Sequence, residues 1–137
     1  MIVVDASVLL DALLDDGPSG SAARAVLEAD PAWAAPACLP IEVLSVTRRR
    51  LLRGQVTPKR AGDAVEVLAA LEIDWIDPRA ITSRIWELRD NVAAFDAAYV
   101  AGAEALGVEL VTGDRRLAAA AGVRCRVCVV PEPPGAG

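Results

Sequence analysis

Short apolar runs alternate with longer amphipathic segments along the whole chain. The segments have apolar residues at helical spacing, as in ASVLLDALL, where positions 6, 9, 10, 13 and 14 are apolar. Strands that alternate with helices predict an α/β fold, a three-layer α/β/α sandwich around a mostly parallel sheet of about five strands. The runs that have the length of buried strands are residues 2–4, 33–35, 73–76, 108–111 and 125–130.

Proline and glycine mark where the expected helices begin and end. In the segment PIEVLSVTRRRLLRG, Pro40 falls in the first turn and Gly54 stands where the helix should stop. The same reasoning applies to the segments that follow. The other expected starts are Pro58, Pro78 and Asp114, and the other expected ends are Gly107 and Gly122.

No repeat or long linker divides the chain, so residues 1–130 are expected to form a single domain. Residues 131–137, PEPPGAG, are expected to be a disordered tail. No basic residue precedes Arg24, and Asp5 interrupts the apolar N-terminus, which disfavours a signal peptide. The longest uncharged stretch, residues 31–41, is too short to cross a bilayer. We therefore expect a cytoplasmic protein.

The chain contains no histidine and three cysteines. The lack of histidine excludes Ser-His-Asp, Cys-His and histidine-ligated zinc chemistry. An odd number of cysteines suits a reducing compartment. Cys125 and Cys128 have a C-x-x-C spacing, but in a strand an offset of three places them on opposite faces, so structural roles are expected. Catalysis would then depend on carboxylates, hydroxyls or a metal held by oxygen.

Four acidic residues fall where the predicted sheet presents one edge. Asp5 and Asp114 follow strands, whereas Glu42 and Asp96 lie near the starts of helices. Singly, each has an ordinary explanation, as an N-cap or as a charge that suits the helix dipole. Together they gather four carboxylates that would repel one another. An all-oxygen cluster of this kind suits Mg²⁺ or Mn²⁺.

The stretches MIVVDASVLLDALL and FDAAYVAGAEALGVELVTGDRRL resemble the PIN-domain family, particularly the VapC-type toxins of toxin–antitoxin pairs. The resemblance covers nearly the whole chain. It implies a PIN-like fold and a metal-dependent ribonuclease, in which Asp5, Glu42, Asp96 and Asp114 match the catalytic acidic quartet. By the same resemblance, Asp5, Asp96 and Asp114 are the expected metal ligands, and Glu42 would hold a second metal or orient the attacking water.

Two hydroxyl residues, Ser7 and Thr112, match small positions that support the acids in relatives, although capping or strand roles explain them equally well. Relatives often have Ser or Thr where this chain has Ala93, so a helix cap is either missing or supplied by Asn91.

The resemblance also has implications for substrate and partners. It implies an RNA substrate cut to leave a 5′-phosphate and a 3′-hydroxyl, a small antitoxin protein and a homodimer. The apolar stripes LLDALL and VLAALEI fit a dimer interface, and they fit a plain core equally well.

The net charge is −5, to which the four acids contribute −4, so the rest of the chain carries −1. The segment from Ile41 to Arg60 contains six basic residues and only one acidic residue, Glu42. Aromatic residues make up only 4% of the chain, so no platform for stacking bases is evident, and any RNA contact would be made through phosphates and shape. Ordinary solvated arginines are the alternative to phosphate contacts. The candidate RNA-binding residues are Arg48, Arg49, Arg53, Arg115 and Arg116.

Other functions fit less well. A phosphoacceptor receiver domain needs paired acids after the first strand and a lysine after the last, whereas this chain has Asp5 alone and its one lysine is Lys59. A haloacid-dehalogenase-like phosphatase needs Asp-x-Asp, but Ser7 occupies the second position. A catalytically silent PIN-like module that binds RNA or a protein is the remaining alternative, which the presence of all four acids disfavours.

Overall fold

Five strands form one sheet within residues 1–131, which the computed structural model describes, and all their pairings are parallel. The strand order is β3-β2-β1-β4-β5. The predicted parallel sheet is confirmed. The strands are β1 (Ile2–Val4), β2 (Trp33–Pro36), β3 (Asp74–Ile76), β4 (Glu109–Thr112) and β5 (Val127–Val129).

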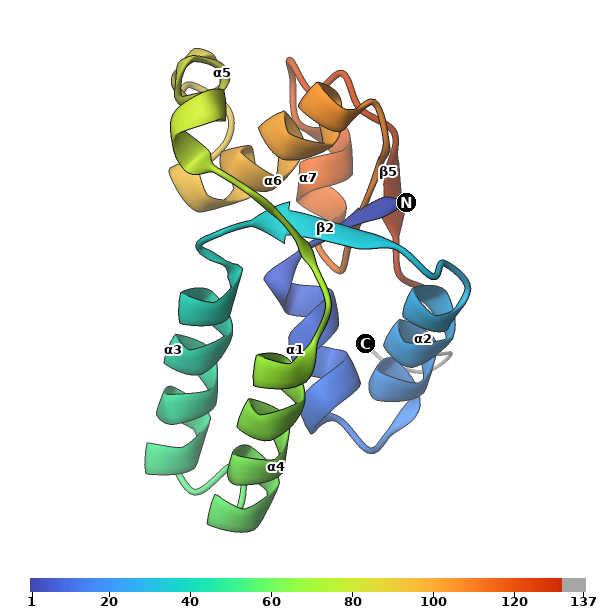
Figure 1. Ribbon diagram of the computed structural model, residues 1–137, viewed down its shortest axis with the longest axis vertical. Coiled ribbons are helices and arrows are strands. Elements are labelled where there is room, and N and C mark those ends of the chain that lie inside the picture. The colour runs from blue at the N-terminus through green and yellow to red at the C-terminus, as the bar shows by residue number, and fades with distance from the viewer. Residues whose placement is uncertain (132–137) are drawn as a thin grey trace.

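Helices cover both faces of the sheet (Figure 1). One group, α1 to α4, lies on one face, and α5, α6 and α7 lie on the other (Figure 1). The predicted three-layer sandwich is therefore confirmed. The helices are α1 (Ala6–Leu14), α2 (Pro18–Glu28), α3 (Leu39–Leu52), α4 (Pro58–Ala70), the 3-10 helix η1 (Pro78–Ile81), α5 (Thr82–Glu87), α6 (Ala94–Leu106) and α7 (Arg115–Ala119).

The chain reverses its direction of travel across the sheet at β1. From β1 it moves outward through β2 to β3, and it then returns to place β4 on the other side of β1. Val4 pairs with Val111, and the backbone N–H of Asp5 donates to the carbonyl of Val111 at 3.0 Å. In open parallel sheets, ligands bind beyond the carboxyl ends of the strands at such a reversal. This register places the residues after β1 directly beside the residues at the end of β4.

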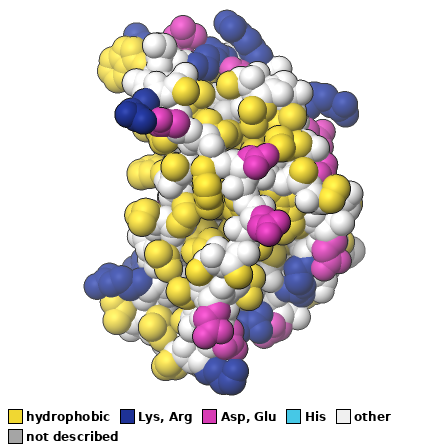
Figure 2. Space-filling model, viewed as in Figure 1, with side chains coloured by type: hydrophobic (Ala, Val, Ile, Leu, Met, Phe, Trp, Pro, Cys, Tyr) yellow, Lys and Arg dark blue, Asp and Glu magenta, His cyan; other side chains and the backbone are white. Residues whose placement is uncertain are grey.

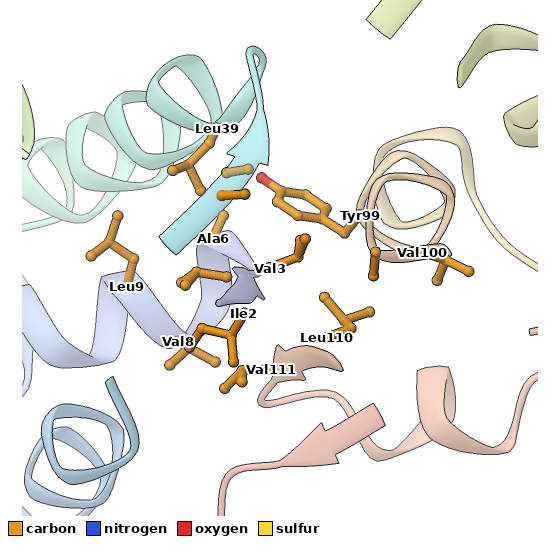
Figure 3. Packing of buried hydrophobic residues seen from close by; sticks show 14 of the residues in the cluster. Ile2, Val3, Ala6, Val8, Leu9, Leu39, Tyr99, Val100, Leu110 and Val111 are labelled. Atoms are coloured by element: carbon orange, nitrogen blue, oxygen red, sulfur yellow. The ribbon is translucent and has the colours of Figure 1, made fainter. Parts of the chain in front are cut away.

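The core between the layers is mainly aliphatic (Figure 3). Val3, Leu9, Leu39 and Leu110 are all 2% exposed or less. Burying each such side chain contributes roughly 1.5–3 kcal/mol. Tyr99 of α6 is also fully buried, and Figure 3 shows its ring reaching from α6 toward Leu39 at the start of α3.

Most of the predicted helix boundaries are correct, for the reasons that the sequence suggested. The hydroxyl of Thr57 caps α4 by accepting the backbone N–H of Arg60 at 3.1 Å. Gly107 ends α6 with a left-handed φ of 66°, a conformation that glycine adopts without a steric penalty. Gly54, with φ of 70°, follows the end of α3 in the same way.

Two predicted boundaries are wrong. Helix α7 ends at Ala119 rather than at Gly122, and β5 begins at Val127, so Cys125 lies in a bend before the strand. The backbone of this segment is held by other partners. Arg84 donates to the carbonyl of Gly122 at 2.6 Å, and Glu104 accepts the backbone N–H of Arg124 at 2.8 Å. These bonds fix a turn where the sequence pattern predicted helix and strand.

The remaining expectations concern the chain end, the cysteines and a membrane. Apart from Pro131, the tail predicted at residues 131–137 lies outside the described residues. Cys38, Cys125 and Cys128 are all free thiols. Within residues 1–131, no helix has the length and apolarity that crossing a membrane requires.

Candidate active site

Asp5 is the most enclosed of the four acids, at 5% exposed. It occupies the N-cap position of α1, yet its side chain makes no capping hydrogen bond. Instead, its Oδ2 accepts the Ser7 hydroxyl at 2.9 Å and the Thr112 hydroxyl at 2.6 Å. The ordinary capping explanation therefore does not hold for Asp5. The hydroxyls of Ser7 and Thr112 orient its carboxylate, and no backbone N–H of α1 donates to it.

The two hydroxyls also fix the loop after β4. Ser7 Oγ accepts the backbone N–H of Gly113 at 3.1 Å, and Thr112 Oγ1 accepts that of Asp114 at 3.1 Å. Thr112 is fully buried. Because β1 and β4 are paired in register, each hydroxyl donates to Asp5 and accepts from the neighbouring loop. The ends of the two strands are thus held together through one carboxylate.

Asp96 lies in the first turn of α6 and is half-buried. Burial raises the pKa of its carboxyl, and the charges of Asp5 and Asp114 raise it further, while Arg116 opposes the shift. The pKa of Asp96 thus responds to the charges of two other predicted acids. The N-cap of α6 is Ala93, and no side chain caps it, so Asn91 does not supply the cap.

Asp114 does act as an N-cap, of α7. Its Oδ1 accepts the backbone N–H of Arg116 at 2.9 Å, and the Arg116 guanidinium approaches the same atom at 3.3 Å. Burial alone would raise the pKa of Asp114, but the hydrogen bonds from Arg116 outweigh it and hold the pKa below its ordinary value. Asp114 and Asp96 are thus shifted in opposite directions.

Glu42 reaches the same edge of the sheet from the first turn of α3. Its Oε1 accepts the Tyr99 hydroxyl at 3.0 Å and the Cys38 thiol at 3.5 Å. Burial raises the pKa of Glu42 against these two hydrogen bonds, and the charges of Asp5 and Asp96 add to the shift. Burial beside Glu42 likewise raises the pKa of Cys38 to about 11, so its thiol stays protonated.

Two grooves meet at Asp114. One, of about 300 Å³, is lined in part by Asp96, Asp114 and Arg116. The other, of about 430 Å³, is lined in part by Ser7, Arg49 and Asp114. Each groove therefore brings one predicted arginine to the acids. A further groove of about 580 Å³, at the opposite edge of the sheet, contains none of the candidate residues.

The other basic residues of the region are arranged differently. Arg48 and Arg53 are exposed on α3 and its C-cap but line neither groove, and Arg115 is exposed at the start of α7. Arg60 donates to the carbonyl of Leu13 and forms an ion pair with Asp16. Lys59 forms an ion pair with Asp63. On the face seen in Figure 2, basic side chains are scattered among acidic ones and form no single positive field.

Sequence reasoning missed two residues of the site, Tyr99 and Cys38, which contact Glu42. Arg50, a member of the predicted basic cluster, lines one groove, and Asn91, which was considered only as a helix cap, lines the other. A signal existed for Tyr99, which is the only tyrosine of the chain and lies three residues after Asp96 in an alanine-rich segment. No pattern in the sequence marks Cys38.

The donor set suits a hard divalent cation, because every candidate ligand is a carboxylate. The raised pKa values of Asp96 and Glu42 reflect a cost of burying these charges together that a cation would relieve. In residues 1–131, no three acidic, cysteine or histidine side chains are already grouped closely enough to hold a metal ion. The residues thus fit a metal in chemistry, and their side chains would have to converge on it.

A family model described as the PIN domain matches residues 2–123. The chain belongs to the PIN-domain family. Within it, the VapC-type resemblance is confirmed by ribonuclease VapC1 of Mycobacterium tuberculosis, which is 40% identical over 130 residues, or 93% of this chain and 96% of the relative. The catalytic roles of the four acids remain predictions.

Solved structures share this PIN fold. A crystal structure of Mycobacterium tuberculosis VapC20, described as a sarcin–ricin-loop-cleaving toxin, superposes with a TM-score of 0.69 at 16% identity, covering 90% of this chain and 97% of that one. A toxin–antitoxin complex from Klebsiella pneumoniae gives a TM-score of 0.68 at 23% identity, covering 97% and 100%. At these identities the likeness concerns the fold alone.

Proposed function

We propose that this protein is a Mg²⁺- or Mn²⁺-dependent ribonuclease that acts as the toxin of a toxin–antitoxin pair. The observation that carries the proposal is the Asp5 carboxylate, which two hydroxyls hold at the strand reversal although it caps nothing. Burying a carboxylate is costly unless it is well hydrogen-bonded. A fold that accepts this cost beside two other electrically coupled acids supports a functional role for the cluster.

Asp5, Asp96 and Asp114 are the residues that would hold the metal. Glu42 lies farther along the edge, bound to Tyr99, and would hold a second ion or orient the attacking water. When bound, the cation supplies a readily deprotonated water and offsets the charge that develops on the phosphate.

The chain's own side chains would divide the remaining work. Ser7 and Thr112 keep Asp5 in one orientation, so the Asp5 carboxylate itself would need little reorganisation when substrate arrives. The raised pKa of Glu42 makes it a better proton acceptor than an exposed glutamate. Attack in line with the leaving oxygen would give a 5′-phosphate and a 3′-hydroxyl.

Arginines in the two grooves would position the RNA backbone. Arg49 lines one groove and Arg116 the other, with Asp114 between them. A strand that follows both grooves would place phosphates near an arginine on each side of the acids. Such contacts fix the register of the strand without reading its sequence.

The proposed partners are a small antitoxin protein and a second copy of the chain. The name of the Klebsiella pneumoniae complex supports an antitoxin. The stripe LLDALL does not provide a free surface, because Leu9 and Leu10 are buried and Leu13 and Leu14 pack against the core. A partner would instead meet exposed apolar residues of α3 and α4, with Val67 of the stripe VLAALEI among them. The exposed ones on α3 and α4 are Ile41, Leu44, Leu52, Val65 and Val67.

The proposal is tested by incubating purified, partner-free protein with a panel of structured RNAs in Mg²⁺, Mn²⁺ or EDTA. Asp5→Asn and Asp96→Asn should each reduce cleavage to background. Asp63→Asn is the matched control, because Asp63 is an exposed acid paired with Lys59 outside the site, and it should cleave as the wild type does. Metal-bound wild-type protein that cuts no RNA would contradict the proposal, and RNA binding without cleavage would support the silent module.

A further inference from the structure

Phe95 is the only phenylalanine of the chain, and it is 62% exposed. A single exposed apolar side chain is common on protein surfaces and needs no explanation by itself. The position of this ring is what distinguishes it. Phe95 lies in the first turn of α6, immediately before Asp96, which lines one of the two grooves.

The orientation of Phe95 follows from Tyr99. Residues four apart share one face of a helix, so Phe95 lies one turn beyond Tyr99 on the same side of α6. Tyr99 is fully buried and its hydroxyl binds Glu42 of α3. The face of α6 that meets Glu42 therefore continues outward into an exposed aromatic ring. Phe95 thus stands at the margin of the site, directly before Asp96 and one turn from Tyr99, the residue that binds Glu42.

Two other aromatic residues are well exposed, but their surroundings differ. Trp86 is 67% exposed, and the Arg89 guanidinium already covers its ring at 4.7 Å. Trp75 is 48% exposed on β3, an edge strand that contributes no acid to the site. Among the described residues, Phe95 is the one exposed ring that adjoins a candidate catalytic acid.

An RNA strand with a phosphate at the acids places the flanking bases beside them. We propose that Phe95 stacks on the base of a nucleotide next to the cleaved bond. The contact rests on the proposed ribonuclease function and deepens it. Because every base has a π-face, such stacking tolerates any sequence and helps to position the strand. The aromatic content of 4% is too low for an extended stacking platform, and Phe95 would supply a single stacking contact.

The test first maps the cleaved bond in a 5′-labelled RNA and then places an abasic nucleotide on either side of it. Binding is measured in an Asp5→Asn background, and cleavage in the otherwise native protein. Phe95→Leu keeps an apolar side chain without a π-face, and it should weaken RNA binding roughly five- to 150-fold. Phe95→Trp should retain the affinity. Trp75→Leu is the matched control and should bind as the wild type does.

The abasic RNA makes the test specific to stacking. Removing the stacked base should weaken binding to native Phe95 protein, but it should cause little further loss with Phe95→Leu, because the two changes remove the same contact. Equal binding by Phe95→Leu and native protein, or an abasic effect that is the same in both, would overturn the proposal. Failure of the native protein to cut RNA in metal would instead refute the ribonuclease function, independently of any Phe95 variant.

Discussion

Replacing Thr112 with valine tests the framework around Asp5 with little change in shape. Valine keeps the volume and branching of threonine and removes only the hydroxyl. That hydroxyl donates to Asp5 at 2.6 Å and accepts the backbone N–H of Asp114 at 3.1 Å, inside a fully buried position. One substitution therefore removes a hydrogen-bond partner both from the Asp5 carboxylate and from the backbone N–H of Asp114.

The size of the effect follows from these two hydrogen bonds. A bond to a charged group contributes about 1.5–3 kcal/mol, and a neutral one about 0.5–1.5 kcal/mol. Asp114 is partly exposed, so water replaces some of the second bond. We expect Thr112→Val to destabilise the protein by roughly 2–4 kcal/mol without metal. Loss of orientation at Asp5 should also slow cleavage by about tenfold or more, since tenfold corresponds to 1.4 kcal/mol.

Thr112→Ser is the matched control, because serine keeps the hydroxyl and loses only the buried methyl group. Removing one methyl group costs roughly 0.5–1.5 kcal/mol in stability. Urea unfolding and single-turnover cleavage of one labelled RNA would be measured for both variants. Serine should retain most of the cleavage rate and valine should not. If valine cleaves as fast as serine, the hydroxyl does not orient Asp5 for catalysis.

Three other substitutions separate the parts of the site from the scaffold. Tyr99→Phe removes one of the two hydrogen bonds that Glu42 accepts, so kcat should fall about tenfold with little change in KM, whereas a proportional rise in KM would show that Tyr99 serves binding. Burial would raise the pKa of the Glu104 carboxyl, but the hydrogen bonds from Arg84 outweigh burial and hold this pKa below its ordinary value of 4.5. The Arg84–Glu104 pair therefore stabilises the fold fully above pH 4.5, and its contribution is lost as the pH falls through the lowered pKa. In urea titrations, Glu104→Gln should therefore cost roughly 1–3 kcal/mol at pH 7 and progressively less below pH 4.5. Arg49→Gln should weaken RNA binding and reduce the steepness of log affinity against log salt concentration by about one, the value for one lost phosphate contact. An unchanged slope would show that Arg49 does not contact the RNA.

The fold was largely predictable because its signals are local. The run IVVD followed by a helical stripe predicts β1 and α1, and Gly107 ends α6 as its position suggests. The turn between α7 and β5 was not predictable, since Arg84 and Glu104, distant in the sequence, hold its backbone. Contacts of this kind leave no mark in the local pattern.

The gathering of the acids was predictable from topology, but their individual environments were not. Residues after parallel strands share one edge of the sheet, which places Asp5 and Asp114 together. The sequence did not show that Asp114 caps its helix while Asp5 does not. Nor did it show that Tyr99 binds Glu42, because that contact depends on how α6 packs against α3.

Diffraction from crystals grown in Mn²⁺ tests the central claim most directly, because anomalous scattering locates the ion itself. The account predicts an anomalous peak bounded by the carboxylates of Asp5, Asp96 and Asp114, and loss of that peak in Asp5→Asn crystals. A Mn²⁺-saturated crystal with no peak at these three residues, from protein that cleaves RNA, would contradict it.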